Sequence, residues 1–433
     1  MSRLNLNGGR RFNLRLSATV RALIWLYGTT LLLAFGHGMI LPTLPAMVEV
    51  FDLPVGAPAL VITAWAVGQF AGTLPSGFIV DRMGTRVAML IGPVAITAGA
   101  FAAAAAPAFW FLLAAMVLGG AGNSLWMIGR EVSGVELVRS DQRGRLMSGF
   151  MGFSSTGMAL GPGVGGVVTD QIGFRMVFVI FGAIALVVLL ATVAIAFSQR
   201  ARLREKPRTE AATVKTPAPD RAPGLSGRAR EILRLFMAIE PRLRVTYAVL
   251  VFATFVMMLY RMSHQSMLPL YVGTELGFSS TQVGLLFSIS GIVVFTMIVP
   301  AGFIIDKLGR KWATVPSTAL PALVFALYPF ATTMPQLAAL SVIIGMSTGL
   351  SLGSVATSTY DVVPSHARAR LQAIRRTLAE VGGVGGPLLA GLIATAHSPS
   401  TVFFVYAPLM LVASALLLFV AKETLVKHRA ATG

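Results

Sequence analysis

Long apolar stretches alternate with short polar segments along the whole chain. Each stretch has about 20 residues or more, enough for a helix to cross a hydrocarbon layer of about 30 Å. Backbone groups find no water in lipid, so these stretches must be helices; they lack the short alternation of a membrane barrel. The pattern predicts twelve membrane-spanning helices, at residues 22–48, 57–80, 87–106, 109–138, 146–169, 174–197, 245–272, 280–305, 312–331, 334–362, 371–396 and 400–421.

One polar segment is far longer than the others and separates six predicted helices from six. It starts with alternating arginines and lysines and continues as an Ala/Pro-rich stretch, which is typical of disorder. Near its end, apolar residues recur at helical spacing: Ile232, Leu235, Phe236 and Ile239. They predict a short amphipathic helix on the membrane surface, with a plain flexible linker as the alternative. The predicted domains are an N-terminal bundle, a basic linker and a C-terminal bundle, at residues 1–199, 200–243 and 244–433.

Composition supports a membrane protein, and the distribution of charge argues against a nucleic-acid-binding one. Hydrophobic residues make up 55% of the chain and charged residues 12%, against about 25% in soluble domains. The net charge of +18 is concentrated in alternate connections, which predicts cytoplasmic termini and an integral protein of the bacterial cytoplasmic membrane. The intervening connections carry few charges, namely Glu49, Asp52, Asp170, Arg175 and Glu275.

Several kinds of site have no signal in the sequence. The chain contains no cysteine, which excludes disulfides and thiolate metal sites. It has no phosphate-binding loop and no catalytic domain, so we expect neither enzymatic activity nor a cofactor or metal. The first apolar stretch is longer than the core of a signal peptide, and we interpret it as an uncleaved first span.

A ten-residue motif occurs twice, 225 positions apart. GFIVDRMGTR begins at Gly77, and GFIIDKLGRK begins at Gly302. Further matches at the same or nearly the same offset pair Glu136 with Asp361, Gly161-Pro162 with Gly386-Pro387, and His37 with His264. Each half is therefore a version of one structural unit. In a membrane protein, such halves predict a binding site at their interface.

The duplicated loops resemble the signature of the major facilitator superfamily, and the resemblance covers essentially the whole chain. It implies an all-α membrane protein in which twelve helices form two pseudo-symmetric six-helix bundles around a central cavity. Alternating access would arise as one bundle rocks against the other. A second motif resembles that of the twelve-helix drug:proton antiporters, with generic small-residue packing as the alternative. Its residues are Gly157, Gly161, Pro162, Gly165 and Gly166.

The charges of the two loops predict a latch that holds the cytoplasmic side closed while the outer side is open. We expect Asp81 to cap the helix predicted at 371–396. Arg82 and Arg86 are expected to pair with Glu136, and Lys307 and Lys311 with Asp361. The alternative is that these charges only orient the protein in the membrane. The complete gate set is Gly77, Asp81, Arg82, Gly84, Arg86, Glu136, Gly302, Asp306, Lys307, Gly309, Lys311 and Asp361.

Polar side chains inside the predicted spans are candidates for substrate binding and proton coupling, because they are costly in lipid and usually face a cavity. The set is His37, Asn123, Arg130, Glu131, Tyr260, Arg261, His264, Gln265 and Glu380. Histidine changes charge near neutral pH. Three structural alternatives stay open: an Arg130–Glu131 ion pair, histidines that only donate hydrogen bonds, and neutralisation of Arg375 or Arg376 by Glu380.

These features predict a proton-coupled exporter of amphipathic organic compounds. Exporters of this type often carry an arginine before the paired glycines of the fourth helix, where this chain has Met116, and an acid in the first helix, which it lacks. The alternatives are an importer of an anionic small molecule and a lipid or lysolipid exporter, with a non-transporting membrane sensor as a remote one. The expected partners are a small-molecule substrate, protons and membrane lipids, with no nucleic acid, and the protein is expected to be a monomer.

Overall fold

The structure is a computed structural model that describes residues 18–139, 142–203, 236–351, 354–364 and 367–423. The regular elements in these ranges are all helices. The N-terminal half contains α1 (Ala18–Gly38), η1 (Leu41–Thr43), α2 (Leu44–Val50), α3 (Ala59–Met83), α4 (Thr85–Ala104), α5 (Phe109–Leu137), α6 (Arg143–Gln171) and α7 (Phe174–Leu203). The C-terminal half contains α9 (Pro241–Leu270), η3 (Tyr271–Glu275), α10 (Ser280–Phe303), η4 (Ile304–Leu308), α11 (Lys311–Thr314), α12 (Pro316–Leu327), η5 (Tyr328–Phe330), α13 (Met334–Ser351), α14 (Ser354–Val362), α15 (Arg368–Ala396), α16 (Pro399–Ala415) and η6 (Leu416–Val420).

The predicted fold class is confirmed, because each predicted span coincides with one helix or with consecutive helical segments. Ten candidate spans among the described residues are long and apolar enough to cross a membrane. The two further predicted spans correspond to α3 and α6. The clearly apolar part of α3 is limited to Ala59–Thr73, and α6 is rich in glycine, serine and threonine. Such small residues lower hydropathy but let helix backbones approach closely.

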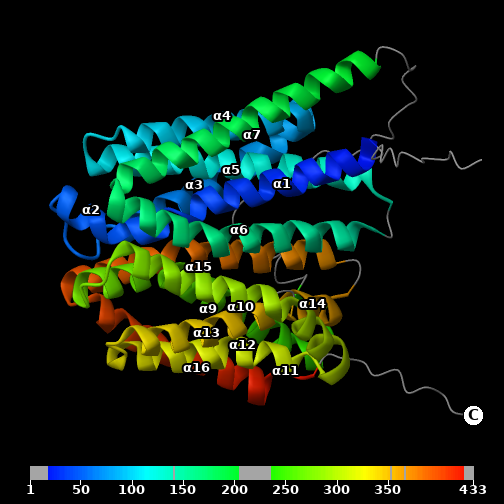
Figure 1. The fold of residues 1–433 in the computed structure, drawn as a ribbon. Coiled ribbons are helices and arrows are strands. Elements are labelled where there is room, and N and C mark those ends of the chain that lie inside the picture. Colours follow the sequence, from blue (N-terminus) through cyan, green and yellow to red (C-terminus); the bar gives the residue numbers. More distant parts are fainter. Residues whose placement is uncertain (1–17, 140–141, 204–235, 352–353, 365–366, 424–433) are drawn as a thin grey trace, which may run out of the picture.

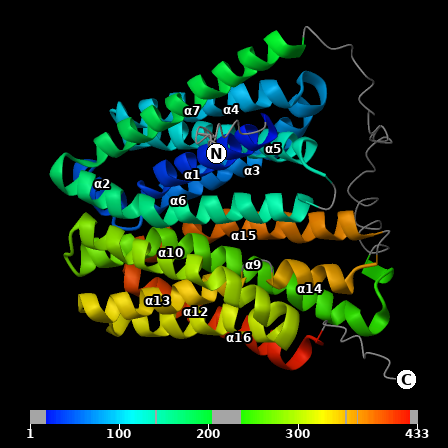
Figure 2. The ribbon, with the colours of Figure 1, turned by 45° about the vertical axis from the view of Figure 1, so that its right-hand side comes forward.

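The two halves lie against each other as two layers of helices (Figures 1 and 2). The contacts between them are made mainly by α6 against α10 and by α3 against α15. In both views α2 lies at one end of the helices and α14 at the other. We call the end with α14 and the duplicated loops the basic end, since it carries Arg82, Arg86, Arg310 and Lys311. The end with α2, Asp170 and Glu275 is the opposite end.

At the opposite end the two halves are joined by close helix packing and by a helix cap. A side chain on Gly284 of α10 would collide with the carbonyl oxygen of Pro162 in α6, and one on Gly166 would collide with that of Ser280. The Asp170 carboxylate, at the end of α6, accepts hydrogen bonds from the backbone amides of Ser280 (3.0 Å) and Thr281 (2.7 Å) at the start of α10. A carboxylate at a helix N-terminus is favourable because it meets the positive end of the dipole.

Closer to the basic end, the interface glycines have free space beside them. No described atom lies within 4 Å of a side-chain carbon placed on Gly152 of α6 or Gly302 of α10. Val299 of α10 is 80% exposed. The tight α6–α10 packing is therefore confined to the opposite half of these helices, and we describe the conformation as closed at the opposite end.

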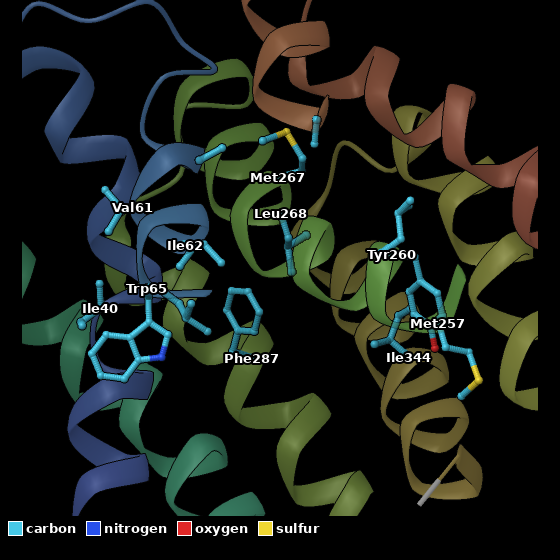
Figure 3. Close-up of a cluster of buried hydrophobic side chains, with 14 of the residues drawn as sticks. Ile40, Val61, Ile62, Trp65, Met257, Tyr260, Met267, Leu268, Phe287 and Ile344 are labelled. Carbon is cyan, nitrogen blue, oxygen red and sulfur yellow. The ribbon is translucent and has the colours of Figure 1, made fainter. Parts of the chain in front are cut away.

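The buried core extends through both halves. Figure 3 shows Ile40, Val61 and Trp65 of the N-terminal half together with Leu268 and Phe287 of the C-terminal half. Each of these five side chains is less than a tenth exposed. Because close packing fixes the positions of helices in a bilayer, this cluster holds α1, α3, α9 and α10 in register around the interface.

The predicted amphipathic helix of the linker falls mostly on residues 204–235, which lie outside the described residues. Its described end packs onto α9. Ile239 is fully buried, and the Arg244 guanidinium donates hydrogen bonds to the carbonyls of Ile239 (3.0 Å) and Met237 (2.6 Å). The linker is thus fixed to the C-terminal half where it joins α9.

Candidate substrate cavity

A cavity at the interface of the halves consists of two adjoining chambers. The first, of about 410 Å³, is lined mainly by α1, α3 and α5. The second, of about 250 Å³, is lined mainly by α6, α9 and α10, with a smaller part from α13. Both share Ser154 and Met158 of α6 and Gln265 of α9. The cavity therefore has walls from both halves, as the internal duplication predicts.

Seven of the nine predicted cavity residues line these chambers. His37, Asn123 and Arg130 line the first chamber, and Tyr260, Arg261 and His264 line the second, with Gln265 in both. The helical spacing within α9 brings residues 261, 264 and 265 to one face. Glu131 and Glu380 line neither chamber.

Arg130 is held from several sides within the first chamber. The residue is only 6% exposed. Its Nη1 donates to Thr30 Oγ1 of α1 at 2.8 Å, and its guanidinium lies 4.3 Å from the ring centroid of Phe150 in α6. Its Nε is buried with no hydrogen-bond partner. A buried guanidinium N–H without an acceptor is costly, so this group is available to a ligand.

The two acids of the predicted set line neither chamber, and each is in an ion pair with an arginine of its own helix. Glu131 Oε1 lies 3.8 Å from Arg130 Nη2, so the structural alternative considered for this pair is present in the structure. Glu380 Oε1 lies 4.0 Å from Arg376 Nε, one helical turn before it. Both glutamate side chains are more than a third exposed. The predicted cavity role of these two acids therefore has no support from their position.

The two symmetry-related histidines differ in their surroundings. His264 is buried, and its Nε2 lies 2.9 Å from the Tyr328 hydroxyl. His37 stacks on Trp65 with ring centroids 4.3 Å apart, and its buried Nε2 has no partner. His264 is thus engaged in a hydrogen bond, whereas His37 is free to bind a ligand or exchange a proton.

The remaining walls are aromatic and methionine-rich. The first chamber is lined by Trp65, Trp126, Met127, Met258 and Met262. Phe287 and Ile344, visible in Figure 3, line the second. Methionine side chains are flexible and polarisable and adapt to irregular apolar ligands. The cavity combines an adaptable apolar surface with a few polar and cationic groups.

The first duplicated loop does not form the predicted ion pairs. Glu136 and Arg86 line one small cavity of about 170 Å³, but no ion pair joins Glu136 to Arg82 or Arg86 among the described residues. Arg82 lies over the ring of Phe78, at 4.4 Å. Asp81 is exposed, and no hydrogen bond joins it to α15 in the part of the chain that the structure describes. The predicted partners are therefore not engaged in this conformation.

The second loop forms a different ion pair from the one predicted. Asp361 Oδ2 accepts from Arg310 Nε at 3.1 Å, while Lys311 Nζ donates to the carbonyl of Leu418 at 2.9 Å. Neither lysine forms an ion pair with Asp361 among the described residues. Because the predicted latch belongs to the conformation with the opposite end open, this assignment stays a prediction. The two copies differ at this point, since Arg310 corresponds to Thr85 and only the second loop has a basic residue there.

The loop glycines occupy two different environments. Gly84 and Gly309 end their helices with φ of 87° and 139°, in the region that favours glycine over other residues. Gly77 and Gly302, the first residues of the two copies, border open space. The side chain of Asp306 lies outside the described residues.

The small residues of α6 pack on two faces. Side chains on Gly157 or Gly161 would collide with the backbone of α1, and one on Gly165 with that of Met39 directly after it, whereas Gly166 and the Pro162 carbonyl face α10. The four-residue spacing of the first three forms one ridge along α6. The motif therefore joins α6 to its own half on one face and to the other half on the other face.

Several contributors were not identified from the sequence. Trp65 and Phe150 contact His37 and Arg130, and Glu423 accepts from the backbone amides of Arg310 (2.9 Å) and Lys311 (3.1 Å). Asp170 was noted only as a charge. The position of Glu423, immediately after the last span, is the only sequence feature that could have indicated its role. Nothing in the sequence distinguishes Trp65 and Phe150 from aromatic residues of the core.

Comparison with known proteins identifies a family. Residues 26–247 and 250–433 match the model of the Major Facilitator Superfamily. NorA, the quinolone resistance protein of Staphylococcus aureus, is 24% identical over 168 residues, 39% of this chain and 43% of NorA. Multidrug resistance protein 2 of Bacillus subtilis is 22% identical over 277 residues, 64% of each chain. The alignments thus span less than half of NorA and less than two thirds of the Bacillus protein.

Solved structures share the fold. A D-xylose–proton symporter superposes with a TM-score of 0.68 at 16% identity, covering 93% of this chain and 98% of the symporter. A peptide transporter crystallised with sulfate superposes with a TM-score of 0.72 at 15% identity, covering 92% and 94%. At these identities the likeness is one of fold alone.

Proposed function

The chain belongs to the major facilitator superfamily and is a transport protein rather than an enzyme, and from this premise we propose that it exports amphipathic organic compounds in exchange for protons. The names of two relatives, quinolone resistance protein and multidrug resistance protein 2, support drug efflux. The observation that carries the proposal is the apolar, methionine-rich cavity between the halves, in a conformation closed at the opposite end.

The proposed mechanism is alternating access. In the present conformation the Asp170 cap and the α6–α10 glycine contacts close the opposite end. Rocking of the halves would break these contacts and engage the loops of the basic end, including Asp81 with α15. The basic end is proposed to be cytoplasmic, since basic residues are retained on that side of a bacterial membrane. The protein would act as a monomer.

Proton coupling is proposed to use His37. Among the described residues that line the first chamber, His37 is the one that can take up and release a proton through an imidazole ring. Its Nε2 has no partner and lies in the chamber that holds Arg130. Because protonation of His37 occupies its free Nε2, it would compete with any substrate that binds at this atom. Substrate and proton would therefore influence each other through direct proximity.

Transport by the purified protein in proteoliposomes with an imposed pH gradient tests this proposal. Candidate amphipathic compounds are added, and substrate and proton movements are recorded together. We expect proton flow opposite to substrate flow, lost in His37→Gln but retained in His397→Gln. His397 is a suitable control because it lies at the opposite end, directly after α15.

Two outcomes contradict the proposal in different ways. Proton and substrate moving in the same direction would establish import, the first alternative that the sequence left open. Substrate movement that ignores the pH gradient in both the parent protein and His37→Gln would exclude proton coupling.

A further inference from the structure

The cavity contains a guanidinium group from each half and no carboxylate. Arg130 of α5 lines the first chamber and Arg261 of α9 the second. None of the described residues that line either chamber is Asp or Glu. Uncompensated charge is costly at membrane depth. Two such cations in a transport cavity are explained if the ligand carries a negative charge.

Internal acids do not cancel this charge. Arg261 is partly buried and makes no hydrogen bond or ion pair with any described residue. Glu131 approaches Arg130 only to 3.8 Å, without a hydrogen bond, and its side chain is 37% exposed. Water screens an ion pair of that kind strongly. The cavity therefore keeps a net positive charge.

The environment of Arg130 fixes its orientation for a ligand. Thr30 holds Nη1, and Phe150 supports the face of the guanidinium. The buried Nε has no acceptor among the described residues. An arginine fixed in this way loses little conformational entropy on binding and presents donors suited to a carboxylate, sulfonate or phosphate.

The two arginines are placed to contact one molecule. Their chambers adjoin through Ser154, Met158 and Gln265, so a ligand that fills both touches α5 of one half and α9 of the other. The walls between them are aromatic and methionine-rich, which suits an apolar body. Simultaneous contact with both halves would also link binding to their rocking.

We propose that the transported substrates are amphipathic organic anions, whose acidic group binds Arg130 and Arg261 while the apolar body lies against the Trp65–Trp126–methionine wall. This inference rests on the proposed transport function and adds the charge class of the substrate. An anionic lipid headgroup offers the same chemistry as a free organic anion, and the experiment below distinguishes these two sources.

Binding of a matched set of probes tests the charge class. The probes are 1-naphthylacetate, the uncharged 1-naphthylacetamide and the cationic 1-naphthylethylammonium, titrated calorimetrically into the protein in phosphatidylcholine nanodiscs, with empty nanodiscs subtracted. We expect the anion to bind at least about tenfold more tightly than the amide, and the cation to bind most weakly. Arg261→Gln should weaken binding of the anion about tenfold or more while leaving the amide unchanged.

Variants of Arg130 and of a remote arginine complete the test. Arg130→Lys keeps the charge but loses the planar donor set, and we expect an intermediate loss. Arg175→Gln, at an exposed arginine of the opposite end, should have no effect. Arg261→Gln keeps the test valid if variants of the buried Arg130 fail to fold. Equal affinity for anion and amide, or an unchanged anion affinity in Arg261→Gln, would overturn the proposal.

The source of the anion is decided by adding phosphatidylglycerol to the nanodiscs. Weaker naphthylacetate binding in the parent but not in Arg261→Gln would assign the site to a lipid headgroup, and unchanged binding would assign it to the free anion. Failure of this inference is distinct from failure of the proposed function. Proton-driven flux of cations unaffected by Arg261→Gln would exclude only the charge class, whereas anion-selective binding without proton-coupled flux would exclude only the antiport.

Discussion

The two halves derive from one repeated unit but use corresponding positions differently. His264 is bonded to Tyr328 in the C-terminal half, whereas His37 stacks on Trp65 and leaves Nε2 without a partner. Asp361 is paired with Arg310, while Glu136 has no ion pair among the described residues. The two halves thus share one arrangement of helices. At these corresponding positions the polar groups have partners in the C-terminal half and none among the described residues of the N-terminal half.

This division gives each experiment an internal control. A substitution in one half can be compared with the substitution at the corresponding position in the other half, in the same protein. If the two halves were functionally equivalent, both members of each pair would respond alike. The structure predicts that they respond differently.

The largest difference is expected at the histidines. Tyr328→Phe leaves His264 buried without its hydrogen bond and should lower the free energy of unfolding by about 1–3 kcal/mol. His37→Gln removes a ring contact but no hydrogen bond, and should reduce transport with a smaller change in stability. Thermal unfolding in detergent, run beside the flux assay, measures both. Equal loss of stability in the two variants would contradict the distinction drawn here.

A smaller difference is expected at the acids of the basic end. Asp361→Asn removes the 3.1 Å ion pair with Arg310, whose side chain is only 14% exposed. The substitution should lower the free energy of unfolding by about 1 kcal/mol. Glu136→Gln should be close to neutral in this conformation. Chemical denaturation of the two variants measures this difference in stability. A larger loss of stability in Glu136→Gln would indicate that Glu136 is already paired with the basic residues of the first loop.

The smallest effect is expected at the opposite end, where Asp170 corresponds to Thr395 at the 225-residue offset. Asp170→Ala removes a charge from the start of α10 and should favour opening by about 1 kcal/mol, or roughly fivefold, with Thr395→Ala as the control. The chain has no cysteine, so Ser288→Cys, at the α6–α10 interface beside Gly163, would be its single thiol. Its rate of alkylation reports opening.

The pH dependence of that contact follows from the carboxylate. Burial alone would raise the pKa of Asp170, but the hydrogen bonds from Thr281 and Ser280 outweigh it and lower the pKa. The contact is therefore fully present above the ordinary aspartate range, near 4, and is lost only as the pH falls through the lowered pKa. The ratio of alkylation rates between Asp170→Ala and its parent should stay constant from pH 5 to 8. A ratio that collapses toward one within this range would show that protonation of Asp170 opens this end.

Much of the fold and of the cavity could be predicted from the sequence. Apolar length determines the spans, and the duplicated motif determines the halves and so the interface at which a site must lie. Polar side chains at His37, Arg130 and Arg261 then marked that interface, because polar groups inside a span are tolerated chiefly where they face a cavity. The same reasoning did not hold for Glu131 and Glu380, which line neither chamber. Both are near enough to an arginine on their own helix to pair with it.

The sequence by itself determined the helices, their duplication and the identity of the polar groups within them, since these depend on local hydropathy and spacing. Only the tertiary structure decided which groups are paired. Arg130 meets Thr30 across 100 residues, and His264 meets Tyr328 across 64. Asp361 pairs with Arg310 across 51 residues. Hydrogen bonds depend on distances of tenths of an ångström and on side-chain direction, and these are fixed by packing between helices far apart in the chain.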